Sequence, residues 1–193
     1  MRLFSSLDER YQRPRQRHRP DEKRERAVEA ARTVFAARGY GSTTIHEICR
    51  IAGIGVGTFY AQFESKPEVM GAVIENEHEQ HLAAIDAVAQ TGRRDSFFAR
   101  YLAARDTRLL AAIREAAAVD RPVRSTYERV LGEARARLAD AIERQRASAR
   151  TRSMVSARTV AWFALSLAGT VGGDGPDEAA VAEALSVLTF GDA

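Results

Sequence analysis

The sequence predicts an all-α protein, and three observations carry that prediction. Alanine and arginine, which favour helices, are abundant, and runs of β-branched residues are few. Proline is scarce between residues 68 and 121. Apolar residues recur every three to four positions through most of the chain. At 193 residues the chain can bury a substantial core. We expect a small helical domain over residues 20–65 and a larger one over residues 66–193.

The stretch from Thr43 to Lys66 predicts two short helices joined by a turn. Thr44 and Glu47 have the spacing of a capping box, ahead of an apolar stripe. Gly53 then suits a left-handed helix stop. In the second helix, Phe59 and Phe63 occupy inner positions, whereas Val56, Thr58, Tyr60, Ala61 and Gln62 face outward. A short helix, a glycine turn and a second helix with exposed hydroxyl groups are typical of a helix-turn-helix.

The same stretch resembles the DNA-binding signature of the TetR family of transcriptional regulators. The matched elements are the threonine-rich start, Ala52-Gly53-Ile54, Gly57-Thr58-Phe59-Tyr60, Phe63 and Ser65-Lys66. With the preceding helix, the resemblance covers about the first third of the chain. The sequence departs from the family pattern at Gly55, where serine is common, and at Ala61 and Gln62, where aromatic residues or histidine are common.

Positive charge is concentrated near the N-terminus, although the net charge is only +3. Residues 1–70 carry 13 Lys and Arg against 9 Asp and Glu, whereas residues 71–193 carry 16 against 17. Residues 1–19 lack an apolar period and are predicted to form a flexible basic arm. The arm either follows DNA phosphates or is a solubilising tail. The charge asymmetry suits a polyanionic partner.

The remaining helices are predicted from caps and breakers. The first begins at Pro20 and Asp21 and ends at Gly39. A long helix follows from Lys66 to about Gln90. The later helices are expected from Asp95 to about Val119, from Val123 to Ala149 with many arginines outside, from Ser153 or Ser156, and from Asp177.

The sequence offers no catalytic or metal-binding set. Gly53, Gly55 and Gly57 lie in a helical context and not after a strand, so they do not predict a phosphate loop. His78 and His81 share a helix face with nearby glutamates, but a polar helix face explains them better than a metal site. We therefore expect no enzyme, no metal and no cofactor.

The expected compartment and the expected absence of membrane contact follow from three further features. No segment reaches the ~18 apolar residues needed to span a bilayer, so no membrane partner is expected. The single cysteine, Cys49, is expected to be a small core residue. With no evident secretory signal, a cytoplasmic protein is predicted.

The resemblance implies a transcriptional regulator of the repressor type that binds a palindromic double-stranded DNA operator as a homodimer. DNA contacts are implied at Lys23, Thr44, Val56, Gly57, Thr58, Tyr60, Gln62 and Lys66. Within the larger domain, the dimer interface is expected at Ala161, Trp162, Leu165, Ala168, Leu185 and Leu188.

Release of DNA by a small, largely apolar ligand is the third implication of the resemblance. The aromatic residues of the larger domain suggest its pocket, together with one arginine: Phe97, Phe98, Tyr101, Arg105, Tyr127, Trp162 and Phe163. An alternative remains open, namely a TetR-like DNA-binding protein without a small-molecule ligand, acting as an architectural or protein-controlled factor.

Overall fold

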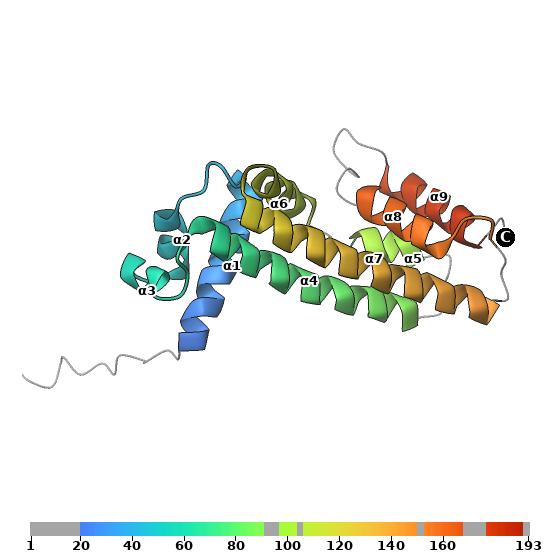
Figure 1. The fold of residues 1–193 in the computed structure, drawn as a ribbon, viewed down its shortest axis with the longest axis horizontal. Coiled ribbons are helices and arrows are strands. Elements are labelled where there is room, and N and C mark those ends of the chain that lie inside the picture. Colours follow the sequence, from blue (N-terminus) through green and yellow to red (C-terminus); the bar gives the residue numbers. More distant parts are fainter. Residues whose placement is uncertain (1–19, 91–96, 104–105, 150–152, 168–176, 191–193) are drawn as a thin grey trace, which may run out of the picture.

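The structure is a computed structural model that describes residues 20–90, 97–103, 106–149, 153–167 and 177–190 (Figure 1). Within these ranges every regular element is a helix, which confirms the predicted fold class. In order they are α1 (Pro20–Arg38), α2 (Ile45–Ala52), α3 (Val56–Tyr60), α4 (Lys66–Gln90), α5 (Phe97–Ala103), α6 (Thr107–Val119), α7 (Arg121–Ala149), α8 (Ala157–Leu167) and α9 (Glu178–Phe190). The predicted basic arm, residues 1–19, lies outside the described residues.

Two long helices, α4 and α7, form the spine of the molecule. Figure 1 shows them side by side and running in the same direction, with α1–α3 at one end and α5, α8 and α9 at the other. Three contacts fix their register: Glu75 pairs with Arg129, Asp86 with Arg137, and the Gln145 amide donates to the Ala89 carbonyl at 2.5 Å. Helix α6 lies against α1, back at the end of the molecule that carries α1–α3.

The apolar core has two clusters, one at each end of the spine. The first joins α1, α2 and α3 to the first half of α4, to α6 and to the start of α7. The second joins the end of α4 to α5, α8, α9 and the second half of α7. The first half of α4, including Met70 and Val73, therefore packs in the same core as the helix-turn-helix. None of the described helices is both long and apolar enough to cross a membrane.

The predicted caps around the turn are confirmed. The Thr44 hydroxyl oxygen caps α2 by accepting from the Glu47 amide at 3.3 Å. Gly53 adopts the left-handed conformation with φ 61°, where a residue with a Cβ would be strained. Its amide and that of Ile54 bond to the last carbonyls of α2, which ends the helix and turns the chain toward α3.

One expectation about the later helices was wrong. The single helix expected from Asp95 to Val119 is two helices, α5 and α6. Asp106 starts α6 as its cap, because its carboxylate accepts from the amides of Arg108 and Leu109 at 3.2 and 3.1 Å. In α7, Arg146 is buried and donates to the Thr189 carbonyl at 3.0 Å, so not every arginine of that helix faces solvent.

Candidate DNA interface and an adjoining cavity

The helix-turn-helix is held from behind by α1. Ile48 and Phe59 are buried in the first core cluster, which fixes α2 and α3 against α1. Arg26 of α1 donates to the carbonyls of Ala52 and Gly53, and the second bond is 3.2 Å long. A guanidinium thus satisfies carbonyls that the end of α2 leaves without helical partners. The opposite side of α2 and α3 is left free.

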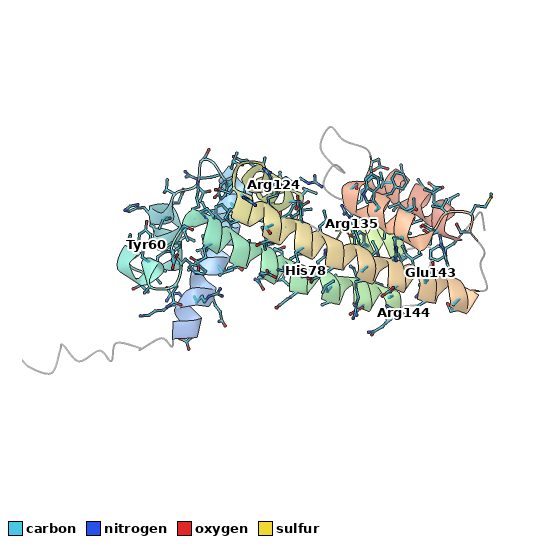
Figure 2. All side chains as sticks on the ribbon, viewed as in Figure 1. Tyr60, His78, Arg124, Arg135, Glu143 and Arg144 are labelled. Atoms are coloured by element: carbon cyan, nitrogen blue, oxygen red, sulfur yellow. The ribbon has the colours of Figure 1, made fainter. Side chains whose placement is uncertain are left out.

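Most of the predicted DNA contacts lie on this free side or at its edge. Figure 2 shows Tyr60 at the outer end of the helix-turn-helix, and its side chain is 51% exposed. Thr44 and Gly57 are also exposed, whereas Lys23, Val56, Thr58 and Gln62 are half-buried. A Cβ built on Gly57 would meet no atom within 4 Å, so the backbone of α3 is open there. The surface offers hydroxyl groups and accessible backbone, both suited to phosphates and base edges.

Lys66 stabilises the loop before α2, in addition to any DNA contact. Its ammonium donates to the carbonyls of Tyr40 and Thr43 at 3.0 and 3.2 Å, and lies 4.3 Å from the centre of the Tyr40 ring. Because an ammonium has three N–H donors, one remains for a phosphate oxygen. The lysine therefore fixes the loop before α2 as well as standing near the predicted interface.

The same loop is held from α6. The Glu115 carboxylate accepts from the amides of Tyr40 and Gly41 at 2.8 and 2.9 Å. The Tyr40 hydroxyl donates to Asp120, at the end of α6. Burial first, and this hydrogen bond second, raise the pKa of Tyr40. Helix α6 thus contacts the backbone that leads into α2.

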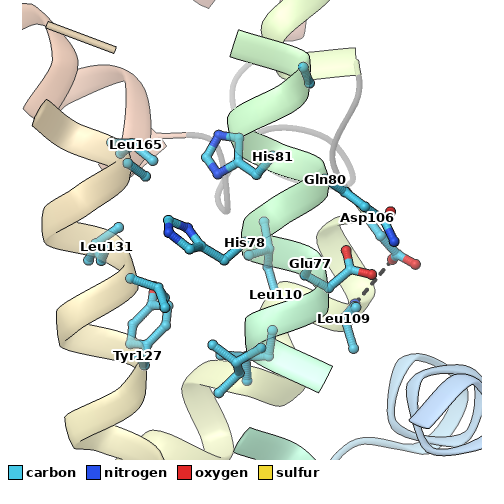
Figure 3. A pocket seen from close by; sticks show the side chains of 15 residues that line it. Glu77, His78, Gln80, His81, Asp106, Leu109, Leu110, Tyr127, Leu131 and Leu165 are labelled. Atoms are coloured by element: carbon cyan, nitrogen blue, oxygen red, sulfur yellow. Dashed lines mark hydrogen bonds between the residues drawn. The ribbon is translucent and has the colours of Figure 1, made fainter. Parts of the chain in front are cut away.

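A cavity of about 220 Å³ lies between α4, α6 and α7 (Figure 3). Its apolar wall is formed by Ile74, Ala84, Leu109, Leu110, Ile113, Val130, Leu131, Ala134 and Leu165. The remaining lining residues carry polar groups: Glu77, His78, Gln80, His81, Asp106 and Tyr127. An apolar cavity with a few polar groups is the usual form of a small-molecule site.

Two ion-paired clusters border the polar side of the cavity. His78 lies 2.8 Å from a Glu133 oxygen, and the other oxygen of Glu133 accepts from Arg129 at 2.9 Å. The bonds from His78 and Arg129 lower the pKa of the Glu133 carboxyl. On the other side, Arg32 of α1 donates to Glu77 at 2.6 Å.

Arg32 also reaches Asp106, at 3.4 Å. Its bond to Glu77 raises the pKa of the guanidinium, which stays charged. Since Glu77 and Asp106 both line the cavity, this arginine connects the cavity wall directly to α1.

The predicted ligand residues divide into separate places. Tyr127 lines the cavity, and the buried Tyr101 reaches its edge because its hydroxyl lies 3.0 Å from Nε2 of His81. Phe97 and Phe98 are buried in the second core cluster. Trp162 and Phe163 do not line the cavity and are 49% and 42% exposed on α8. Arg105 lies outside the described residues.

The predicted dimer residues divide between the core and the surface. Ala161, Leu165 and Leu185 are buried inside the chain's own second core cluster. Trp162 and Leu188 are exposed, as are Phe163 and Val187, so the accessible apolar face of α8 and α9 is offset from the face that the sequence suggested. Ala168 lies outside the described residues.

Comparisons with known proteins agree with this geometry. Residues 27–73 match the family model described as bacterial regulatory proteins, tetR family. This segment belongs to the TetR-family DNA-binding domain. The matched residues run from α1 into α4 and include the whole helix-turn-helix.

Curated TetR-family relatives match over the same part of the chain. The HTH-type transcriptional regulator TtgR of Pseudomonas putida is 34% identical over 67 residues, 35% of this chain and 32% of the relative. The HTH-type transcriptional regulator UidR of Escherichia coli is 37% identical over 60 residues, 31% of each chain. These matches span about a third of the relatives' length.

Solved structures extend the likeness of fold to most of the chain. Salmonella enterica GusR has a TM-score of 0.67 at 20% identity, covering 90% of this chain and 96% of its own. A TetR-family regulator from Rhodococcus sp. has a TM-score of 0.68 at 18% identity, covering 88% and 99%. At these identities the likeness establishes the TetR-family fold and not a shared ligand.

Several residues that build the two sites were not found from the sequence. Arg26, Arg32, Glu115 and Glu133 each act across at least 26 positions of the chain, where periodicity gives no signal. His78 did give a signal, through its polar run on α4, but it was interpreted as part of a polar helix face and not as a cavity residue. Within the described residues, no group of three or more His, Cys, Asp or Glu side chains could hold a metal ion.

Proposed function

We propose that this TetR-family protein is a transcriptional regulator that binds a roughly palindromic DNA operator as a homodimer and is released by a small, largely apolar ligand. The observation that carries the proposal is the contact of one helix, α6, with both sites. Leu109, Leu110 and Ile113 of α6 line the cavity, and Glu115 of the same helix holds the backbone before α2.

DNA binding rests on the open side of α2 and α3. Tyr60 and Thr44 offer hydroxyl groups to phosphates, and Gly57 lets the backbone of α3 approach a base edge. Since α3 carries no arginine for a bidentate guanine contact, discrimination would come from apolar contacts and DNA shape. One such unit makes few base contacts, and a two-fold pair doubles them. The exposed face with Trp162, Phe163 and Leu188 is the proposed dimer contact.

Release would follow from a ligand that favours a different position of α6 and α4. Both helices line the cavity, and α4 begins at Lys66, which bonds to the loop before α2. A coupling of about 1–3 kcal/mol would lower operator affinity about 5- to 150-fold. That range is sufficient to switch a promoter.

The experiment is selection of bound duplexes from random DNA by the full chain, followed by a screen for compounds that release the selected DNA. We expect two inverted half-sites about one helical turn apart, or roughly 34 Å. Absence of any enriched sequence would refute specific DNA binding. Enriched DNA that no cavity-binding compound releases would favour the ligand-independent alternative.

A further inference from the structure

We infer that the cavity between α4, α6 and α7 selects a primary amine on an apolar stem, with the ammonium group donating to Nδ1 of His78. The inference rests on the proposed function, because it names the chemical class of that ligand. Three features support it: a histidine nitrogen without a partner on a residue that lines the cavity, an excess of carboxylates, and an apolar wall.

His78 presents an unused nitrogen to the cavity. The residue is only 8% exposed, and it lines the cavity. Figure 3 shows its ring extending from α4 toward Tyr127 and Leu131 of α7. Nε2 is bonded to Glu133 at 2.8 Å, whereas Nδ1 has no hydrogen-bond partner among the described residues. Because His78 lines the cavity, Nδ1 can form a hydrogen bond with a ligand there.

The hydrogen bond between Glu133 and Nε2 of His78 determines which kind of group Nδ1 can bind. Its pKa is lowered by the bonds from His78 and Arg129, so the carboxylate is ionised at neutral pH and accepts from Nε2–H. In a neutral imidazole with the proton on Nε2, Nδ1 is an acceptor. With this neutral tautomer the ligand group facing Nδ1 must be a hydrogen-bond donor, whereas a protonated imidazole would donate from Nδ1 and could bind a carboxylate ligand.

The charges beside the cavity favour a cationic donor. Each of two guanidinium groups is shared by two carboxylates: Arg129 by Glu75 and Glu133, and Arg32 by Glu77 and Asp106. Of these carboxylates, Glu77 and Asp106 line the cavity and share one guanidinium group, so this side of the cavity carries an excess of negative charge. Carboxylates near a site attract an ammonium and repel an anion.

The apolar wall of the cavity favours an apolar stem on the ligand. Leucine, isoleucine, valine and alanine side chains from α4, α6, α7 and α8 bury an apolar stem, and Tyr127 adds an aromatic ring that can contact a cation. A volume of about 220 Å³ has room for a phenyl ring with a short alkyl chain. A neighbouring groove between α6 and α7 carries Arg114, Arg124 and Arg135, so an anion must be included in the test.

The test is calorimetric titration of the full chain, without DNA, with three ligands of one shape: 4-phenylbutylammonium, 4-phenylbutan-1-ol and 4-phenylbutyrate. We expect the ammonium to bind at least about tenfold more tightly than the carboxylate, with the alcohol between them. Equal affinities, tightest binding of the carboxylate, or no binding of the ammonium at millimolar concentration would each overturn the inference.

Two substitutions of His78 test the roles of its two ring nitrogens separately. In His78→Gln the side-chain amide can reach the place of Nε2, which keeps the Glu133 bond and removes the Nδ1 acceptor. In His78→Asn an amide oxygen can take the place of Nδ1. We expect ammonium affinity to fall about tenfold or more in H78Q and much less in H78N, with unchanged helicity by circular dichroism. Equal affinity of H78Q and wild type would overturn the assigned acceptor.

Operator release is measured separately from ligand binding. If 4-phenylbutylammonium binds through His78 but leaves operator affinity unchanged, the ligand class stands and ligand-controlled release fails. If no DNA sequence is selected while the ammonium still binds, operator binding and its release by ligand fail, and the ligand class of the cavity stands.

Discussion

At the scale of single residues, a few long-range side chains place the DNA-facing surface. Glu115 accepts from two consecutive backbone amides, those of Tyr40 and Gly41, although it lies about 75 positions further along the chain. Its carboxylate also lies close to Gly39, where a Cβ would come within 2.8 Å of it. Glycine at position 39, with φ 78°, thus serves both the turn and this contact.

Replacing Glu115 with alanine should loosen the loop before α2. Because hydrogen bonds from two amides to a charged group are lost at an exposed position, we expect a loss of about 1–2 kcal/mol in the free energy of unfolding, measured in urea. Glu128→Ala is the matched control, since that glutamate is an exposed helix residue on α7. An equal loss in both variants would contradict the role of Glu115.

Residues fixed by local chemistry were predictable, and residues fixed by distant partners were not. The Thr44 cap and the left-handed Gly53 follow from spacing and backbone conformation, and both were predicted. Cys49 was predicted as a core residue and is buried, which raises the pKa of its thiol. Arg32 and Glu133 depend on how α1 and α7 lie against α4, and no local pattern encodes that.

At the scale of elements, helix periodicity identified the helices but not always the face that each one buries. The sequence places α8 and α9 correctly as an apolar pair. Both helices are apolar on more than one side, so periodicity could not separate the side that packs on α5 and α7 from the side left exposed. Similarly, the aromatic residues suggested for the ligand site fall in three different places: the cavity, the second core cluster and the exposed face of α8. The aromatic residues of α5 are in the core because that helix packs them there.

The exposed face of α8 supplies a test of the proposed dimer. Burying Trp162 and Phe163 between two chains would remove apolar surface from water, at roughly 25 cal/mol per Å². Trp162→Glu should place a charge in that interface and give a monomer by light scattering at micromolar concentration. Val119→Glu adds the same charge to an exposed apolar position on α6 and should remain a dimer. A wild-type monomer, or a dimeric Trp162→Glu variant, would contradict the proposal.

At the scale of the whole molecule, the two core clusters share α4 and α7. The cavity lies along this spine, and its wall includes residues from both clusters, such as Ile113 and Leu165. A ligand there contacts the helices that hold the loop before α2. The sequence predicted two regions with a boundary near residue 65, but it could not show that α4 and α6 pack into the core of the helix-turn-helix.

The central claim is that the open side of α2 and α3 binds DNA, and operator titration with Gly57→Ala tests it most directly. The new methyl group meets no atom within 4 Å in the free protein, and alanine favours a helix over glycine by about 1 kcal/mol, so the fold should be as stable or more stable. Against the selected operator at fixed salt, the dissociation constant should rise about tenfold or more, since the methyl group blocks close approach of α3. An affinity within twofold of the wild type, at equal or higher melting temperature, would contradict the claim.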